Sequence, residues 1–214
     1  MKKRRADHME KQGVLAVISG FSGAGKGTVM KALLERHDNY ALSISATTRS
    51  PREGEVDGRE YFFKTKEEFE QMIAGDELVE YAQYVGNYYG TPRAYVQASL
   101  EAGKDVLLEI EIQGAKKVRE KFPEAVLVFI TPPDAEELKR RLTGRGTESA
   151  EKIAARLSRA AQEASQMEDY DFILVNDTVD SCVEELHRLI STMHLRVGNR
   201  RPLIEKIKEE MKQF

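Results

Sequence analysis

The 214-residue sequence predicts an α/β fold built on a parallel β-sheet. Two observations support this prediction. Short aliphatic runs typical of buried strands alternate along the chain with stretches whose apolar residues have helical spacing. In addition, a glycine-rich stretch at 20–28, GFSGAGKGT, joins the first such strand directly to the first such helix. Strands connected through helices run parallel, because each helix carries the chain back along the sheet.

The first strand is expected at Val14–Ser19, an apolar run that stops at Gly20. A helix is expected from Thr28, because the apolar residues after it recur at the spacing of a helix face. Further strands are expected at Asp105–Gln113, Ala125–Thr131 and Phe172–Asn176. Further helices are expected at Tyr95–Ala102, Asp134–Leu142, Ala150–Met167 and Ser181–Met193.

Two segments interrupt the alternation of strands and helices. Residues 43–92 hold short polar strand patterns, one helical stretch at Lys66–Ala74 and many glycines, which predicts an inserted antiparallel lobe. The stretch TGRGTESAEKIAARLSRA at 143–160 is rich in Arg and Gly and is expected to form a mobile flap. From Arg196 to its end, the chain is expected to form a charged helix.

Composition excludes several classes of function. The net charge of −3 gives no bulk attraction to nucleic acid or to an anionic membrane. The single cysteine, Cys182, has no partner for an internal disulfide or a thiolate metal cluster. No apolar run reaches the 18 residues of a membrane span, and the opening MKKRRADHMEKQG has no apolar segment behind it. We therefore expect a cytoplasmic protein.

The glycine-rich stretch has the pattern of a phosphate-binding loop, Gly20-x-x-x-x-Gly25-Lys26, in the strand–loop–helix setting that this loop requires. Glycines let backbone N–H groups converge on a phosphate, and the helix N-terminus adds partial positive charge. The alternative, a glycine-rich turn with a surface lysine, does not explain why strand, spacing and lysine coincide. Gly27 stands where the strict pattern has a Mg²⁺-binding Ser or Thr, and Thr28 follows one position later. Mg²⁺ is thus expected to be held mainly by phosphates, water and a carboxylate.

Other charged residues suit phosphate chemistry. Arg49 and Arg52 bracket Ser50-Pro51 and offer two guanidinium forks for a phosphate dianion, although a solvated pair on a loop is the commoner fate of such residues. Glu109 and Glu111 alternate in the predicted strand, which would point both carboxylates to one face.

Several motifs together carry a family resemblance. SISATTRSPREGEVDGREYFF at 43–63, ELVEYA around Glu80, GNYYGTP at 86–92, LEIEIQGA at 108–115, GRGTES at 144–149 and VND at 175–177 resemble the motifs of guanylate kinases, in the family order. The resemblance runs from about Val14 to Met193 and is closest to the small, single-domain bacterial form. It implies that Mg²⁺-dependent transfer of a phosphoryl group from ATP to GMP, and also to dGMP, is the activity.

The resemblance implies a P-loop NTPase-type three-layer core with a parallel sheet, a mixed α/β GMP-binding lobe and a lid. The implied organisation of this single domain is a core at 13–42, 93–134 and 161–193, a lobe at 43–92, a lid at about 135–160 and a C-terminal helical extension at 196–214. The residues implied for ATP are Gly20, Phe21, Ser22, Gly23, Ala24, Gly25, Lys26, Gly27, Thr28, Asn176 and Asp177. Those implied for the GMP phosphate are Arg49, Arg52, Tyr61 and Tyr89, and for guanine Ser45, Glu80 and Thr91, with Glu111 near the acceptor. Catalytic roles are implied for Lys26, Glu109, Arg145 and Arg156, and Thr28 and Glu109 are the candidate metal ligands.

Two alternatives to a GMP kinase fit parts of the sequence less well. A catalytically silent guanylate-kinase-like module binds phosphopeptides, but such modules lose the phosphate loop, which this chain keeps with Lys26. A related kinase acting on AMP or dTMP would not need Glu80 or the TTRSPR motif. One departure from the family pattern is Glu111, where Asp is usual, and its extra methylene shifts the carboxylate. The oligomeric state, monomer or homo-oligomer, is left open by the sequence.

Overall fold

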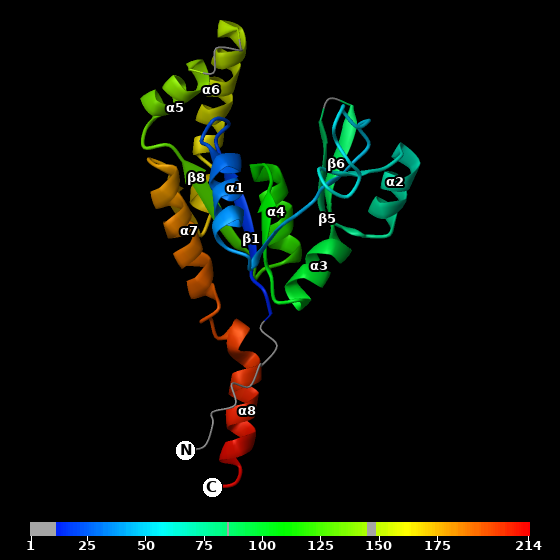
Figure 1. Ribbon diagram of the computed structural model, residues 1–214, viewed down its shortest axis with the longest axis vertical. Helices are drawn as coiled ribbons and strands as arrows, with labels where there is room; N and C mark the ends of the chain where they lie inside the picture. The colour runs from blue at the N-terminus through cyan, green and yellow to red at the C-terminus, as the bar shows by residue number, and fades with distance from the viewer. Residues whose placement is uncertain (1–11, 85, 145–148) are drawn as a thin grey trace.

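The computed structural model describes residues 12–84, 86–144 and 149–214 of the chain. Its centre is a parallel sheet of five strands in the order β2-β7-β1-β8-β9 (Figure 1). The strands are β1 (Leu15–Gly20), β2 (Tyr40–Leu42), β7 (Asp105–Glu109), β8 (Val126–Thr131) and β9 (Phe172–Val175). The predicted parallel sheet is therefore confirmed, with β2 as an additional edge strand.

Helices cover both faces of this sheet, which makes the core three layers deep. Ala16 and Ile18 of β1 pack against α1 (Lys26–Arg36) and α7 (Val179–Met193). Leu15 and Val17, which point to the opposite face, pack with α3 (Arg93–Glu101) and α4 (Ile112–Lys121). Because both faces of β1 are buried, the strand is apolar at every position from 14 to 18.

The inserted lobe has its own sheet in the order β4-β3-β6-β5. Its strands are β3 (Ala46–Thr47), β4 (Phe62–Phe63), β5 (Leu78–Tyr84) and β6 (Asn87–Pro92), and α2 (Lys66–Ala74) belongs to the same lobe. Phe69 of α2 is fully buried against Ala46 and Leu78. The predicted antiparallel pairing holds for β3–β6 and β5–β6, but β3 and β4 run parallel.

Two further helices stand over the glycine loop, and one leaves the body of the molecule. Helices α5 (Ala135–Thr143) and α6 (Ala150–Ala164) rise together beside α1, and a 3₁₀ turn, η1 (Met167–Asp169), leads from them to β9 (Figure 1). After a second 3₁₀ turn, η2 (Gly198–Arg200), helix α8 (Arg201–Met211) extends away from the core. Among the described residues, no helix is both long and apolar enough to cross a membrane.

The strand predicted at Asp105–Gln113 is too long. The structure ends β7 at Glu109 and begins α4 at Ile112, an element that the sequence analysis did not predict. The alternation of acidic and apolar residues in LEIEIQ imitates a strand, but Ile112 is buried as the first residue of the helix. This shift changes the setting of Glu111, which is described with the site below.

Candidate active site

The loop between β1 and α1 forms one wall of the site and needs glycine where its backbone approaches other groups closely. Gly25 directly precedes α1 with φ 88°, and a Cβ on it would lie 2.5 Å from Asn176 Nδ2. A Cβ on Gly20 would lie 2.0 Å from the carbonyl oxygen of Ile130. A side chain at either position would clash. The loop thus brings bare backbone to a helix N-terminus, a setting that favours bound anions.

Lys26 is the first residue of α1 and folds back over the loop. Its Nζ donates hydrogen bonds to the carbonyl oxygens of Gly20, at 2.7 Å, and Phe21, at 3.1 Å. Burial lowers the pKa of Lys26, and nearby carboxylates, Glu109 foremost, oppose this shift. The lysine is therefore a partly desolvated cation at the mouth of the loop, where its charge acts strongly on a nearby anion.

A cavity of about 430 Å³ lies beside the loop and is lined by Gly25, Asn176 and Asp177, among others. Asn176 is buried, and its Nδ2 donates to the carbonyl oxygen of Ala24 at 2.8 Å. Its Oδ1 is also buried but has no hydrogen-bond partner among the described residues. Arg141 donates to the Asn176 carbonyl oxygen at 2.8 Å. The cavity is thus lined by a cation, Arg141, and by Asn176, whose buried Oδ1 is unpaired among the described residues.

Acidic and aromatic side chains surround Arg49 in the lobe. The Nη2 of Arg49 donates to both carboxylate oxygens of Glu55, at 2.9 and 3.0 Å. Its guanidinium carbon lies 5.3 Å from the centre of the Tyr61 ring, and that ring meets Tyr89 edge-on at 6.1 Å. The backbone N–H of Arg52 donates to the same Glu55 carboxylate at 2.7 Å. These hydrogen bonds lower the pKa of Glu55. The Glu55 carboxylate occupies N–H donors of Arg49 and Arg52 that could otherwise bind an external anion.

Glu80 on β5 is a buried acid, 7% exposed. Its Oε1 accepts a hydrogen bond from Thr91 Oγ1 at 2.9 Å. Its Oε2 faces Gly114 of α4, where a Cβ would lie only 3.1 Å away. Desolvation raises the pKa of Glu80, while Thr91 and the charge of Lys117 oppose the shift. A carboxylate this deeply buried, with one neutral partner, is unusual unless an external donor completes it.

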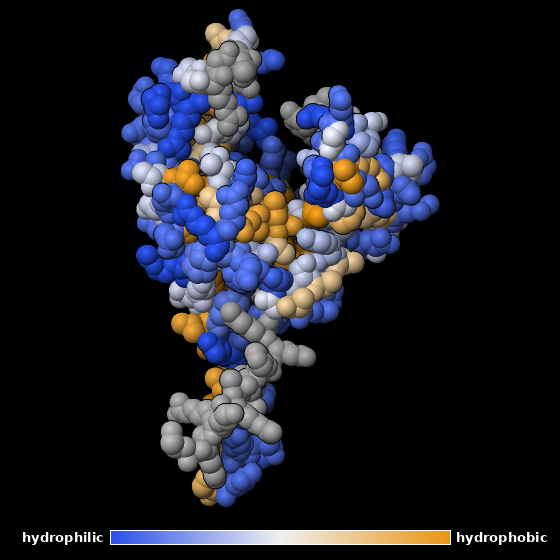
Figure 2. Space-filling view, in the orientation of Figure 1, coloured by the Kyte–Doolittle hydropathy of each residue, from blue (hydrophilic) through white to orange (hydrophobic). Residues whose placement is uncertain are grey.

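A central cavity of about 610 Å³ lies between the glycine loop, the lobe and helix α6. Figure 2 shows the molecule hollowed between the lobe and helices α5 and α6. The cavity is lined by Gly20, Ser22, Lys26, Tyr61, Glu109, Ile110, Glu111, Ile112, Arg156, Arg159 and Glu163. Glu109 is the last residue of β7; it is exposed and lines this cavity. Its carboxyl has a raised pKa because the surrounding protein partly desolvates it, and Lys26 opposes the shift.

The prediction that Glu109 and Glu111 share one face of a strand is wrong. Glu111 is the N-cap residue of α4, beyond the end of β7. The two carboxylates still line the same cavity, because the turn after β7 keeps both at the carboxyl edge of the sheet. Of the two predicted lid arginines, Arg156 lines this cavity, and Arg145 lies outside the described residues.

Comparisons with known proteins show the family to which the chain belongs. The profile of the family described as guanylate kinase matches residues 12–193. A guanylate kinase of Lactococcus lactis is 53% identical over 189 residues, which cover 88% of this chain and 92% of that protein. A guanylate kinase of Caldanaerobacter subterraneus is 52% identical over 202 residues, covering 94% and 98% of the two chains. The chain belongs to the guanylate kinase family. A crystal structure of the guanylate kinase of Anaplasma phagocytophilum superposes with a TM-score of 0.71 at 34% identity, covering 92% of this chain and 95% of that one.

The structure brings predicted site residues from different parts of the chain to one cavity. The central cavity gathers Lys26, Tyr61, Glu109, Glu111 and Arg156, which come from loop, lobe, core and lid. A second cavity, of about 430 Å³, is lined by the ATP candidates Gly23, Gly25, Thr28, Asn176 and Asp177, and Ser45 precedes β3 in the lobe. Their individual roles stay predictions.

The two tyrosines of the GNYYGTP motif have different neighbours in the lobe. Tyr88 stacks on Phe69 in the lobe core at 5.1 Å, whereas Tyr89 meets Tyr61 beside Arg49.

Three residues of the site were missed. Arg141 lies in a run of charged residues on α5, so its sequence looked like a solvated face. Glu55 gave no signal, because its pairing with Arg49 depends on how the loop folds. Arg159 follows Arg156 by three residues on α6, and this helical spacing was a signal that the two share a face.

Proposed function

We propose that the protein transfers the terminal phosphoryl group of ATP to the phosphate of GMP, giving ADP and GDP. One observation carries the proposal beyond family membership: a single cavity brings the loop lysine Lys26 together with Tyr61 of the lobe and Arg156 of the lid. Donor phosphates at Lys26 and an acceptor phosphate at Tyr61 would then meet within one space, which is what direct transfer between two nucleotides requires.

We assign the donor to the loop side of the cavity. ATP phosphates lie on the backbone of Gly20–Thr28, with Lys26 leaving the loop carbonyls to reach the β- and γ-phosphates. The base end of ATP lies in the cavity beside Asn176 and Asp177, where the buried Asn176 Oδ1 is an acceptor that an exocyclic amine completes.

The acceptor is assigned to the lobe. The GMP phosphate takes the place of Glu55 at Arg49, with Arg52, Tyr61 and Tyr89 around it. Guanine presents N–H donors at N1 and N2, and the buried carboxylate of Glu80 is the matching acceptor. The hydroxyls of Ser45 and Thr91 and the carboxylate of Glu111 complete the base contacts.

The residues fit Mg²⁺ bound chiefly through nucleotide phosphates. Among the described residues, no group of three or more His, Cys, Asp or Glu side chains gathers as a metal site. Glu109 Oε2 lies 3.9 Å from where a Gly27 Cβ would stand, and Thr28 follows in the first turn of α1. One carboxylate and one hydroxyl suit an ion that keeps phosphate and water as its other ligands. When bound, Mg²⁺ neutralises charge that develops on the transferring group.

Lid closure completes the assignment. Arg156, and Arg145 on the predicted lid, supply positive charge to the phosphoryl group and exclude water from it. The lobe at 43–92 and the lid at about 135–160 are proposed to move towards the core as units. The net charge of −3 gives no attraction to nucleic acid or anionic membranes, and we expect the enzyme to act in the cytoplasm, as a monomer or a homo-oligomer.

A coupled assay of ADP release tests the proposal. Purified protein receives ATP and Mg²⁺ with GMP, dGMP, AMP or dTMP in turn. We expect the highest kcat/KM with GMP, activity with dGMP, and none above background with AMP or dTMP. A preference for AMP or dTMP would overturn the acceptor assignment, and ADP release that no monophosphate stimulates would overturn the kinase assignment.

A further inference from the structure

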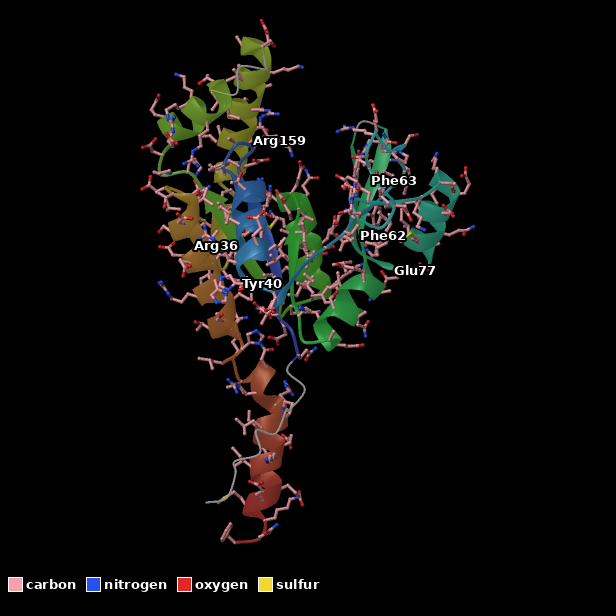
Figure 3. The ribbon with its side chains drawn as sticks, in the orientation of Figure 1. Arg36, Tyr40, Phe62, Phe63, Glu77 and Arg159 are labelled. Carbon is pink, nitrogen blue, oxygen red and sulfur yellow. The ribbon has the colours of Figure 1, made fainter. Side chains whose placement is uncertain are left out.

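Arg159 joins the lid helix to the core across the central cavity. It lies on the side of α6 that faces this cavity (Figure 3). Its Nη2 donates to Glu111 Oε2 at 2.6 Å, and its Nε donates to Glu163 Oε1 at 2.8 Å. Glu163 lies one turn further along α6, whereas Glu111 precedes Arg159 by 48 residues and belongs to the core. One guanidinium therefore bridges two parts of the fold.

The Glu111 carboxylate has little else to hold it. Its side chain is 69% exposed, and although Glu111 is the N-cap residue of α4, that side chain makes no capping hydrogen bond. A glutamate in this setting samples several rotamers. Glu163, whose side chain is only 16% exposed, fixes Arg159 by a second hydrogen bond from the same helix. Glu163 therefore fixes the Arg159 guanidinium through Nε, and Nη2 of the same guanidinium orients the Glu111 carboxylate.

We propose that Arg159 is a positioning residue that holds the Glu111 carboxylate in place for the acceptor nucleotide, and so couples the lid helix to GMP recognition. The inference rests on the proposed function, in which Glu111 contacts the acceptor base. Arg159 does not touch the reacting phosphoryl group in this assignment. Its contribution lies in GMP binding, because a carboxylate that is already oriented loses less freedom when the base arrives.

The test is a steady-state comparison of Arg159→Ala with the unaltered protein. We expect KM for GMP to rise about two- to five-fold, the range of an ion pair that is open to water. The kcat and the KM for ATP stay unchanged. Arg159→Lys, which keeps the charge but loses the planar fork, gives an intermediate KM. Thermal unfolding without nucleotide checks that both variants remain folded.

A double-mutant cycle separates this role from a direct contact with phosphate. In a Glu111→Gln background, Arg159→Ala has no further effect on KM for GMP, because the carboxylate that it positions is gone. The matched control is Arg36→Ala, which removes another exposed ion pair, that with Asp180 on α7, away from the cavity. This control leaves all kinetic constants unchanged.

Three results would overturn the inference while leaving the proposed function intact, provided that the unaltered protein phosphorylates GMP. These are an unchanged KM for GMP in folded Arg159→Ala, a lower kcat at unchanged KM, and an equal loss in the Glu111→Gln background. If the unaltered protein does not turn GMP over at all, the proposed function and the inference fall together.

Discussion

Replacing Glu80 by Gln tests how the acceptor base is chosen. Glu80 is 7% exposed, and its Oε1 already accepts from Thr91 at 2.9 Å. In the proposed complex, the carboxylate lone pairs that Thr91 does not use accept hydrogen bonds from the N–H groups of guanine. A hydrogen bond to a charged group contributes about 1.5–3 kcal/mol, so the loss of the charge lowers kcat/KM for GMP by roughly 10- to 150-fold. AMP lacks these donors, so its kcat/KM does not fall in the same way. The ratio of kcat/KM for GMP to that for AMP therefore falls.

Although Glu80→Gln is expected to lower kcat/KM, it is not expected to lower the stability of the folded protein. Desolvation raises the pKa of Glu80, so the folded state binds the carboxyl proton more tightly than the unfolded state does. The stabilisation from such a group is fully present below the unfolded pKa and is lost as pH rises through the folded pKa. Above that folded pKa, the charged Glu80 therefore opposes folding. The Gln variant keeps an acceptor for Thr91 without the charge, and its Tm without nucleotide is equal to or above that of the unaltered protein.

The pH profile gives an independent readout. Because the pKa of Glu80 is raised, kcat/KM for GMP in the unaltered protein falls on acidification at a higher pH than an ordinary glutamate would give. The Gln variant lacks this step. Glu77→Gln is the control, because Glu77 is an exposed acid three residues earlier that lines an outer cavity next to α2 and α3 (Figure 3). A folded Glu80→Gln variant with an unchanged GMP:AMP ratio would refute the reasoning.

Four further predictions concern the phosphates, the metal and the motions. Lys26→Met stays folded by circular dichroism but loses at least about 100-fold in kcat, because its charge acts on the transferring group; near-normal turnover would exclude the loop assignment. Arg52→Ala weakens GMP binding by about 10- to 150-fold in calorimetry and leaves ATP binding unchanged; equal losses would remove Arg52 from the acceptor site. Chelation of Mg²⁺ abolishes ADP release while GMP still binds, since the metal is held with ATP; turnover in chelator would contradict this. Solution scattering shows compaction when GMP and a non-hydrolysable ATP analogue bind together, as residues 43–92 and the lid close; an unchanged radius of gyration counts against closure.

The sequence predicted the fold where local pattern and final packing agree. The strand predicted at Val14–Ser19 is apolar from Val14 to Ile18 because helices cover both sides of it, and Gly20 and Gly25 are needed where the loop backbone approaches other groups closely with positive φ. Both features are visible in a single sequence. The order of the strands is not, because β7 lies between β1 and β2 in the sheet although the lobe at 43–92 separates it from both of them along the chain.

The candidate site was less predictable where it depends on tertiary partners. In LEIEIQ, acids alternate with apolar residues as in a strand, yet the chain turns after Glu109 and Ile112 packs as helix. Whether an arginine is solvated depends on what stands opposite it: Arg49 finds Glu55, and Arg159 finds Glu111 from a distant part of the chain. Spacing along one helix can suggest a shared face, but not the partner across a cavity.

Three charged groups of the site are partly desolvated, which is unfavourable for folding. Burial raises the pKa of Glu80 and Glu109 and lowers that of Lys26, so each is shifted towards its neutral form. At a buried position such as that of Glu80, a hydrophobic residue of similar size would favour folding, since a buried charge must be desolvated. In the proposed complex, phosphate would pair with Lys26 and guanine donors would pair with Glu80, and ligands that bind the folded state stabilise it. Nucleotide binding is therefore expected to recover the stability that the empty site lacks, with GMP acting through the lobe and ATP through the loop.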